Sequence, residues 1–316
     1  RAFAFGKALV PVPGRMPRPD YQGSAPASMR GSPGLRLGID WSPLSDLLQS
    51  QRGGAQAFTF TRAAFWLPML LLLLSAGVIW LGQWNQSLFR WLNQLGTLTG
   101  DALWANLTLL GDTLVAFALL GLFARHRPDI VYAVCLAALF ATLWVHGLKP
   151  LIDLPRPLAM LGAEQVHVIG QALRSHAFPS GHSTTAFTLA GVILMRGVHP
   201  LLGLAVLMLA LLAGGSRTVV GAHWPLDILA GACGGWLSAA LGIWLAQRRG
   251  WHLRQPLRVT LVLLLAGCAA ALLLSRELGY PQAIGLQMLI GLGSLGYSLI
   301  LLRDLLRETK AAAAAP

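Results

Sequence analysis

The stretch HAFPSGHSTTAFTLAGVILMRGV, residues 176–198, joins a polar loop to an apolar run. Pro179, Ser180 and Gly181 form a small-residue turn, and His182 stands where the apolar run begins. Because serine is a favoured N-cap residue, this pattern predicts a helix that begins just after Ser180. An imidazole at such a boundary is either an interfacial helix cap or a member of a functional site, and the rest of the sequence distinguishes the two.

Apolar runs of this kind recur along the chain. Hydrophobic residues make up 55% of its 316 residues and charged residues only 11%, whereas about 25% of a soluble domain is charged. A membrane-spanning helix needs about 20 mainly apolar residues. The sequence therefore predicts an all-α, polytopic transmembrane helical bundle. We expect eight spans, near residues 64–82, 112–125, 130–148, 182–198, 200–215, 227–246, 258–275 and 282–302.

Two segments outside these spans have a different character. Residues 1–60 are rich in proline, glycine, serine and arginine without a sustained hydrophobic period, which predicts a disordered, basic cytoplasmic leader. Between the first two spans, leucines and tryptophans recur at helical spacing from residue 85 to 112. We expect one amphipathic helix there, lying in the membrane interface and anchored by Trp84, Trp91 and Trp104. A pair of half-spans is the less favoured alternative, because polar residues interrupt the segment.

The net charge of +12 does not indicate a nucleic-acid partner, because the cations lie mainly between apolar runs instead of on one soluble face. With the N-terminus inside, 18 of the 24 lysines and arginines fall on the inner side and 6 on the outer side. The positive-inside rule therefore places both termini in the cytoplasm. Cys135, Cys233 and Cys268 all lie in apolar runs and are expected to be small buried hydrophobes, neither disulfides nor metal ligands.

Three connectors bring polar side chains to the outer side of this predicted bundle. They carry three cations, two imidazoles and a carboxylate: Lys149, Arg156, Arg217, His182, His223 and Asp227. Helices starting near Ser180 and at Pro225 direct their free N–H groups and positive dipole ends to the same side. These groups together suit an anion of charge about −2, such as a phosphate monoester.

Each of these residues also has a simpler structural explanation. Lys149 could be a lysine that snorkels from a helix end, and Arg217 with Asp227 could form a structural ion pair. His223 and Asp227 are four residues apart, however, so the carboxylate can accept a hydrogen bond from one ring N–H and fix the tautomer. The combination on one side of the membrane favours a functional site.

The order Lys149…Arg156-Pro157, Pro179-Ser180-Gly181-His182 and Ser216-Arg217…His223…Asp227 closely resembles the type-2 phosphatidic acid phosphatase superfamily, the membrane lipid phosphatases related to vanadium haloperoxidases. All three family signatures are complete. The resemblance implies a phosphohistidine route without metal or other cofactor. It implies His223 as nucleophile, Asp227 as its orienter and His182 as the acid, with the phosphoryl oxygens held by Lys149, Arg156, Ser180, Gly181 and Arg217.

The resemblance covers residues 64–246, which are expected to form a six-span phosphatase core. Two additional C-terminal spans over 257–303 and a tail over 304–316 lie outside it. The run GLGSLG at 291–296 permits close helix packing, which favours a homo-oligomer contact through these added spans.

The expected activity is removal of phosphate from a lipid phosphate or pyrophosphate at the outer leaflet. Undecaprenyl pyrophosphate, phosphatidylglycerophosphate, phosphatidic acid and the phosphates of lipid A all fit. A phosphotransferase that passes the group to another lipid is the closer alternative, and a lipid transporter or flippase the more distant one. The expected location is a bacterial cytoplasmic membrane, with the active site on the periplasmic face. The expected partners are the membrane lipid substrate, the lipid bilayer and a second copy of the chain.

Overall fold

The computed structural model describes residues 63–249, 255–275 and 277–314, and these residues form helices and no strand. The all-α prediction is therefore confirmed for this part of the chain, while the predicted leader lies outside it. The α-helices are α2 (Ala63–Leu81), α3 (Asn85–Thr99), α4 (Asp101–Leu109), α5 (Thr113–Leu120), α6 (Pro128–Leu151), α7 (Pro157–Leu161), α8 (Gly181–Met195), α9 (Pro200–Val219), α10 (Pro225–Arg249), α11 (Gln255–Leu274) and α12 (Ile284–Ala314), with short 3-10 turns η2 (Gly121–Phe123) and η4 (Pro281–Ala283).

Within the described residues, five helices are long and apolar enough to cross a membrane, namely α6, α9, α10, α11 and α12. The number rises to seven if two bent pairs each count as one span: α2 with α3, bent by 109°, and α4 with α5 and η2, bent by 62°. The remaining predicted span, 182–198, corresponds to α8, which has 15 residues and is shorter than the roughly 20 that a crossing needs.

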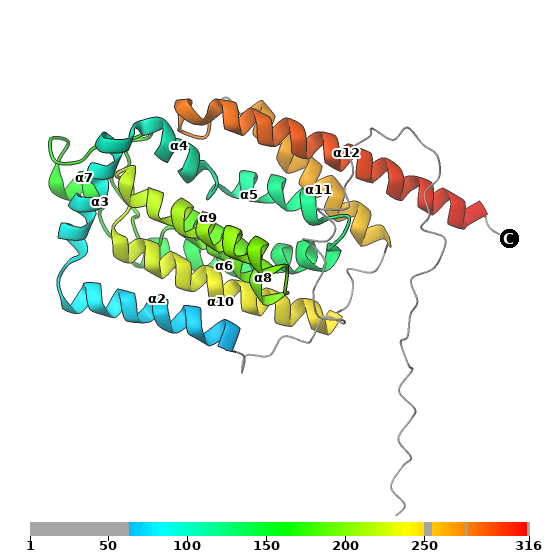
Figure 1. The fold of residues 1–316 in the computed structure, drawn as a ribbon, viewed down its shortest axis with the longest axis horizontal. Coiled ribbons are helices and arrows are strands. Elements are labelled where there is room, and N and C mark those ends of the chain that lie inside the picture. The colour runs from blue at the N-terminus through cyan, green and yellow to red at the C-terminus, as the bar shows by residue number, and fades with distance from the viewer. Residues whose placement is uncertain (1–62, 250–254, 276, 315–316) are drawn as a thin grey trace, which may run out of the picture. The chain divides into compact units, whose positions relative to one another are not determined.

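Helix α8 lies in the centre of the bundle, in contact with α6, α9 and α10 (Figure 1). Most of its side chains are buried, and Phe187, Ala190 and Ile193 belong to the largest hydrophobic cluster. Glycines let the neighbouring helix approach: a Cβ at Gly235 of α10 would lie 2.9 Å from the backbone nitrogen of Thr188. This close approach lets α8 and α10 begin side by side at one end of the bundle.

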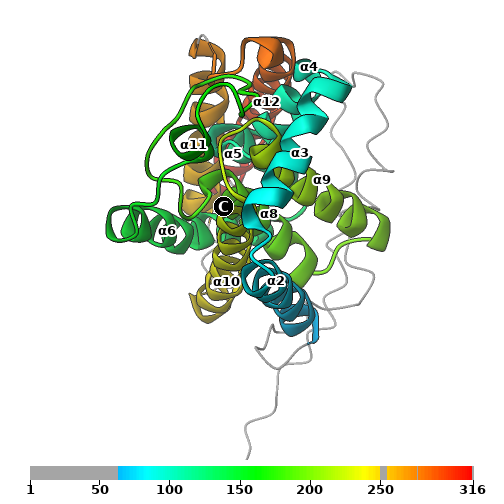
Figure 2. The ribbon, with the colours of Figure 1, turned by 90° about the vertical axis from the view of Figure 1, so that its left-hand side faces the viewer.

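The segment between the first two predicted spans differs from the single amphipathic helix expected there. It forms two helices, α3 and α4, because the chain breaks at Gly100, whose φ of +93° is one that glycine adopts readily. The exposed fractions of Trp84 and Trp91 are 56% and 62%. The Trp104 indole N–H donates a hydrogen bond to the Thr99 hydroxyl. Helix α3 crosses the end of the bundle between α2 and α4 (Figure 2). The prediction of one helix is wrong, and the interfacial position stays a prediction.

The last two helices form an antiparallel pair that packs against α5 (Figure 1). The buried Gln287 amide of α12 donates to the carbonyl oxygens of Leu272 and Ser275 at the end of α11. In the small-residue run at 291–296, Gly291 packs on Leu273 of the same chain. Gly293 and Gly296 have open space beside them. An oligomer contact through these helices stays a prediction.

The α6–α10 contact can be tested with a glycine pair. A Cβ at Gly242 of α10 would lie 2.6 Å from the nitrogen of Ala137 and 2.7 Å from the carbonyl oxygen of Ala133, whereas one at Gly267 of α11 meets nothing within 4 Å. Overpacking costs about 1–3 kcal/mol, so Gly242→Ala should lower the melting temperature in detergent by several degrees. Gly267→Ala should leave it unchanged or raise it, because alanine is the better helix former. Equal melting temperatures for both variants would contradict the packing.

Candidate active site

The predicted site residues come from helix ends that meet at one end of the bundle. Helices α6 and α9 end there and α8 and α10 begin there (Figure 1), and Figure 2 looks onto this end. The backbone N–H of Ser180 donates to the Asp227 carbonyl oxygen at 3.0 Å, and that of His223 to the Arg217 carbonyl oxygen at 3.1 Å. The first bond holds the α8 N-terminus against the first turn of α10, and the second holds the α9–α10 connector against the end of α9.

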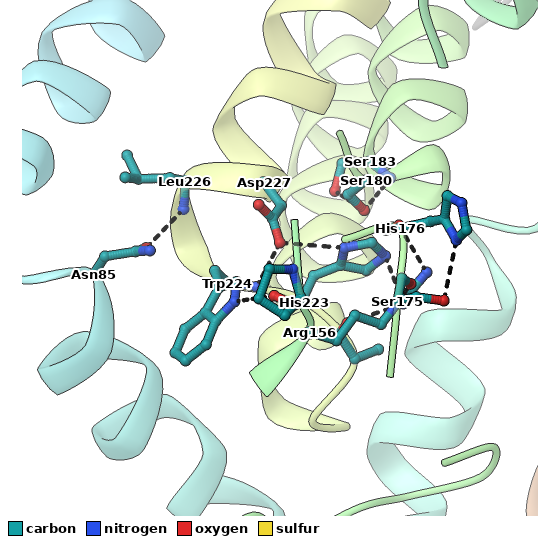
Figure 3. Close-up of polar contacts among 12 residues, drawn as sticks. Asn85, Arg156, Ser175, His176, Ser180, Ser183, His223, Trp224, Leu226 and Asp227 are labelled. Atoms are coloured by element: carbon teal, nitrogen blue, oxygen red, sulfur yellow. Dashed lines mark hydrogen bonds and ion pairs between the residues drawn. The ribbon is translucent and has the colours of Figure 1, made fainter. Parts of the chain in front are cut away.

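His223 lies in the α9–α10 connector and is only 2% exposed. Its Nδ1 faces Oδ2 of Asp227 at 3.5 Å, which is long for a strong hydrogen bond. Nδ1 is buried and has no other partner among the described residues, so this carboxylate is its acceptor. Asp227 Oδ2 also accepts from the backbone N–H of Trp224 at 2.9 Å, which holds the carboxylate in place (Figure 3).

Arg156 closes the other side of the His223 ring. Its Nη1 lies 3.2 Å from His223 Nε2 and donates to the Ala222 carbonyl oxygen at 2.9 Å. Nε and Nη2 donate to the carbonyl oxygens of Ser175 and His176 (Figure 3). The guanidinium is thus oriented by backbone carbonyls from two connectors, and it is only 6% exposed.

These contacts assign the tautomer of His223. A guanidinium has donors and no acceptor, so the Nε2 atom beside Arg156 carries the lone pair. The ring proton then resides on Nδ1 and faces the carboxylate of Asp227. An unprotonated Nε2 is the state in which an imidazole can act as a nucleophile.

The surroundings also keep His223 neutral. Burial, together with the positive charges of Arg156, Arg217 and Lys149, holds the pKa of His223 well below its usual range. Desolvation and like charges both disfavour the imidazolium form. The ring therefore remains a neutral base at physiological pH.

Helix α8 begins as predicted, with the Ser180 hydroxyl accepting from the Ser183 N–H at 3.4 Å. The next two residues, Gly181 and His182, line a cavity of about 200 Å³ with Lys149 of α6. Asp112, which caps the N-terminus of α5 through the Leu114 N–H, lines the same cavity. The structure therefore places Lys149 and His182 together beside the α8 N-terminus.

Arg217 is fixed by two hydroxyls that the sequence did not single out. Its Nη1 donates to Thr108 of α4 at 2.8 Å and to the hydroxyl of Tyr280, between α11 and α12. Asn93 of α3 was also missed: its amide donates to the carbonyl oxygens of His167 and Val219, both at 2.8 Å, and its Oδ1 accepts from the His167 N–H. No local pattern marks Asn93, because its partners lie 74 and 126 residues away in the sequence.

Other ionisable residues of this region make structural contacts. His167 pairs with Asp101 at 2.7 Å, and Asp153 accepts from the backbone N–H of His176. Among the described residues, no three side chains of His, Cys, Asp or Glu group so that they could hold a metal ion. Cys135, Cys233 and Cys268 are unpaired and partly buried.

The sequence of this chain is similar to a protein family model and to several curated proteins. The model of the PAP2 superfamily matches residues 129–251. YbjG of Escherichia coli (strain K12), provisionally named an undecaprenyl-diphosphatase, is 34% identical over 46% of this chain and 70% of its own length. The lipid A 1-phosphatase of Rhizobium etli is 35% identical over 38% of this chain and 55% of its own.

Two further similarities extend this comparison. The bacitracin transport permease protein BcrC of Bacillus licheniformis is 30% identical over 52% of this chain and 81% of its own. The crystal structure of Aquifex aeolicus LpxE aligns with a TM-score of 0.46 and 31% identity, over 50% of this chain and 93% of that one.

The electrostatics of His223 can be measured by NMR of ¹⁵N-labelled histidine. Nε2 should remain unprotonated to a pH well below 6.5, and Arg156→Gln should raise the midpoint because it removes a nearby cation. The folded state binds this proton less tightly than the unfolded chain, so this group makes stability fall as the pH drops through about 6.5. A midpoint near 6.5 in both proteins would contradict the assignment.

Proposed function

Because this chain belongs to the PAP2 superfamily, we propose that it is a membrane lipid phosphatase that hydrolyses a lipid phosphate or pyrophosphate through a phosphohistidine intermediate. One observation carries the proposal. A neutral, buried His223 whose Nε2 lone pair faces Arg156 lies at the same bundle end as the cavity lined by Lys149 and His182. Lipid phosphatases are among the relatives of the chain by name.

The first half-reaction follows from the tautomer. Nε2 of His223 attacks the phosphorus atom, forming an N–P bond as the P–O bond to the lipid breaks. The ring becomes cationic in this step, and the Asp227 carboxylate facing Nδ1 at 3.5 Å stabilises that charge. Catalytic contacts of this kind are often long without substrate and shorten when it binds.

The remaining site residues act on the oxygens. Burial and the nearby cations hold the pKa of His182 well below its usual range, so His182, at the cavity wall, takes up its proton when the dianionic substrate binds. It gives this proton to the leaving lipid oxygen and takes one from the water that then attacks phosphohistidine. Lys149, Arg156, Arg217, the Ser180 hydroxyl and the Gly181 N–H hold the phosphoryl oxygens. Positioning and charge stabilisation of this type account for most of phosphoryl-transfer catalysis. The products are the dephosphorylated lipid and inorganic phosphate.

The cavity beside the α8 N-terminus supports a lipid as the substrate. Its polar end holds Lys149 and His182, and its other walls include apolar side chains of three helices: Phe117 of α5, Val134 and Ala138 of α6, and Leu189 of α8. A headgroup phosphate could enter the cationic end while the tail follows the apolar walls between the helices.

The chemical class fits several lipids. Undecaprenyl pyrophosphate, phosphatidylglycerophosphate, phosphatidic acid and lipid A phosphates all present a terminal phosphate on an apolar body. The charge pattern of the sequence supports termini in the cytoplasm of a bacterial cytoplasmic membrane, with this site on the periplasmic side.

The decisive assay is phosphate release from these four lipids by purified protein in detergent with EDTA. His223→Ala should lower the rate by about a thousandfold or more, because it removes the attacking atom. His126→Ala, an exposed histidine outside the site, serves as the control and should leave the rate unchanged. EDTA-resistant release supports the metal-independent route, and activity that survives in His223→Ala contradicts the assignment of the nucleophile.

The same assay separates the alternatives. If release occurs only when a second lipid is added, and that lipid becomes phosphorylated, the protein is a phosphotransferase. A transport role, which the name of the BcrC relative raises, would give neither release nor transfer and would contradict the proposal.

The path of the lipid tail can be tested with neighbouring substitutions on α6. Ala138 lines the cavity, whereas Leu139 is 65% exposed. Ala138→Phe should raise KM for long-chain lipids by about tenfold, because it blocks an apolar subsite, without affecting a short, water-soluble phosphate ester. Leu139→Phe should change neither. An equal loss on both substrates for Ala138→Phe would argue against the cavity as the tail site.

A further inference from the structure

We propose that Tyr280, in the connector between α11 and α12, is a positioning residue that fixes the guanidinium of Arg217 for binding phosphoryl oxygens. The inference rests on the proposed function. It assigns a catalytic purpose to the two C-terminal helices, which lie outside the residues 129–251 that match the family model.

The hydrogen bonds of Arg217 are the first evidence. Nη1 of a guanidinium has two N–H groups, and in Arg217 one acceptor is the Thr108 hydroxyl and the other is the Tyr280 hydroxyl. The Tyr280 ring also lies 5.8 Å from the guanidinium carbon, within the range of a cation–π contact. The protein therefore uses Nη1 completely and fixes the plane of the group.

The opposite edge of the same guanidinium is left for a ligand. Arg217 is only 3% exposed. Its Nε is buried and has no hydrogen-bond partner among the described residues. A buried donor without a partner is costly, and the Nε–Nη2 edge of arginine matches two phosphate oxygens. The orientation set at Nη1 thus decides where this edge points.

Tyr280 is itself held rigidly. It is 7% exposed and packs in a hydrophobic cluster with Ile169, Val220 and Ala222, the last two from the connector that carries His223. Gly170 approaches it so closely that a Cβ there would lie 2.6 Å from Cε1 of the ring. Because the ring is confined, its hydroxyl is a hydrogen-bond acceptor held in one position, and it can orient the guanidinium of Arg217.

The hydroxyl can be removed alone. Tyr280→Phe should weaken the binding of orthovanadate, a phosphate mimic, by about tenfold, because a hydrogen bond to a charged group is lost. Binding is measured as the concentration-dependent rise in melting temperature, which requires no turnover, and kcat/KM should fall by a similar factor. Tyr297→Phe removes a hydroxyl from α12 away from Arg217 and is the control, expected to match the wild type.

A double-mutant cycle separates positioning from packing. If Tyr280 acts through Arg217, Tyr280→Phe should have little further effect in an Arg217→Lys background, because lysine lacks the planar edge. A purely structural role would instead give additive losses and a lower melting temperature without ligand.

A matched glycine pair provides a second route if Tyr280→Phe fails to fold. Gly170 and Gly162 both have φ of +84°, so alanine strains the backbone equally at each. Only at Gly170 would the new Cβ meet the segment that carries Tyr280: the Gly279 carbonyl oxygen is the nearest atom and Cε1 of the Tyr280 ring lies at 2.6 Å, whereas nothing lies within 4 Å at Gly162. Gly170→Ala should therefore weaken orthovanadate binding, and Gly162→Ala should not.

The outcomes distinguish this inference from the proposed function. Normal wild-type phosphate release with unchanged orthovanadate binding in Tyr280→Phe and Gly170→Ala overturns the role of Tyr280 alone. No phosphate release from the wild type, with weaker orthovanadate binding in both variants, overturns the hydrolysis and leaves the positioning role in place.

Discussion

The structure depends on how two arginines are kept inside one end of a helical bundle. Arg156 and Arg217 are 6% and 3% exposed, and neither forms an ion pair with a carboxylate among the described residues. Buried charge is costly unless it is hydrogen-bonded. Backbone carbonyls satisfy Arg156 and hydroxyls of Thr108 and Tyr280 satisfy part of Arg217. The positive charge that remains favours an anionic ligand.

This constraint explains the shape of the surrounding helices. The carbonyls that bind Arg156 come from irregular connectors, since carbonyls inside a helix already accept from their own helix. Helix α8 is correspondingly short and central, and its free N-terminal N–H groups face the site instead of the membrane. The neutral His223 follows from the same arrangement, because burial and the surrounding cations both disfavour an imidazolium.

Local signals predicted much of this arrangement. The Ser180 cap, the start of α10 at Pro225 and the i,i+4 spacing of His223 and Asp227 all appear in the structure as expected. The single helix over 85–112 was wrong, because the periodicity of its leucines continues across Gly100 while the backbone does not. The contacts of Asn93, Thr108 and Tyr280 with the site span more than 60 residues each, and no local pattern encodes such distances.

The sequence by itself determined the all-helical membrane class and the helix ends at which the candidate site residues lie, and it predicted the reacting groups that we propose. These properties depend on hydrophobic run length, capping residues and side-chain type, which are local. Only the tertiary structure decided which nitrogen of His223 holds the lone pair, which edge of Arg217 stays free, and that the C-terminal helices reach the site through Tyr280. Those properties depend on donors and acceptors brought together from distant segments, so they exist only once the bundle has packed.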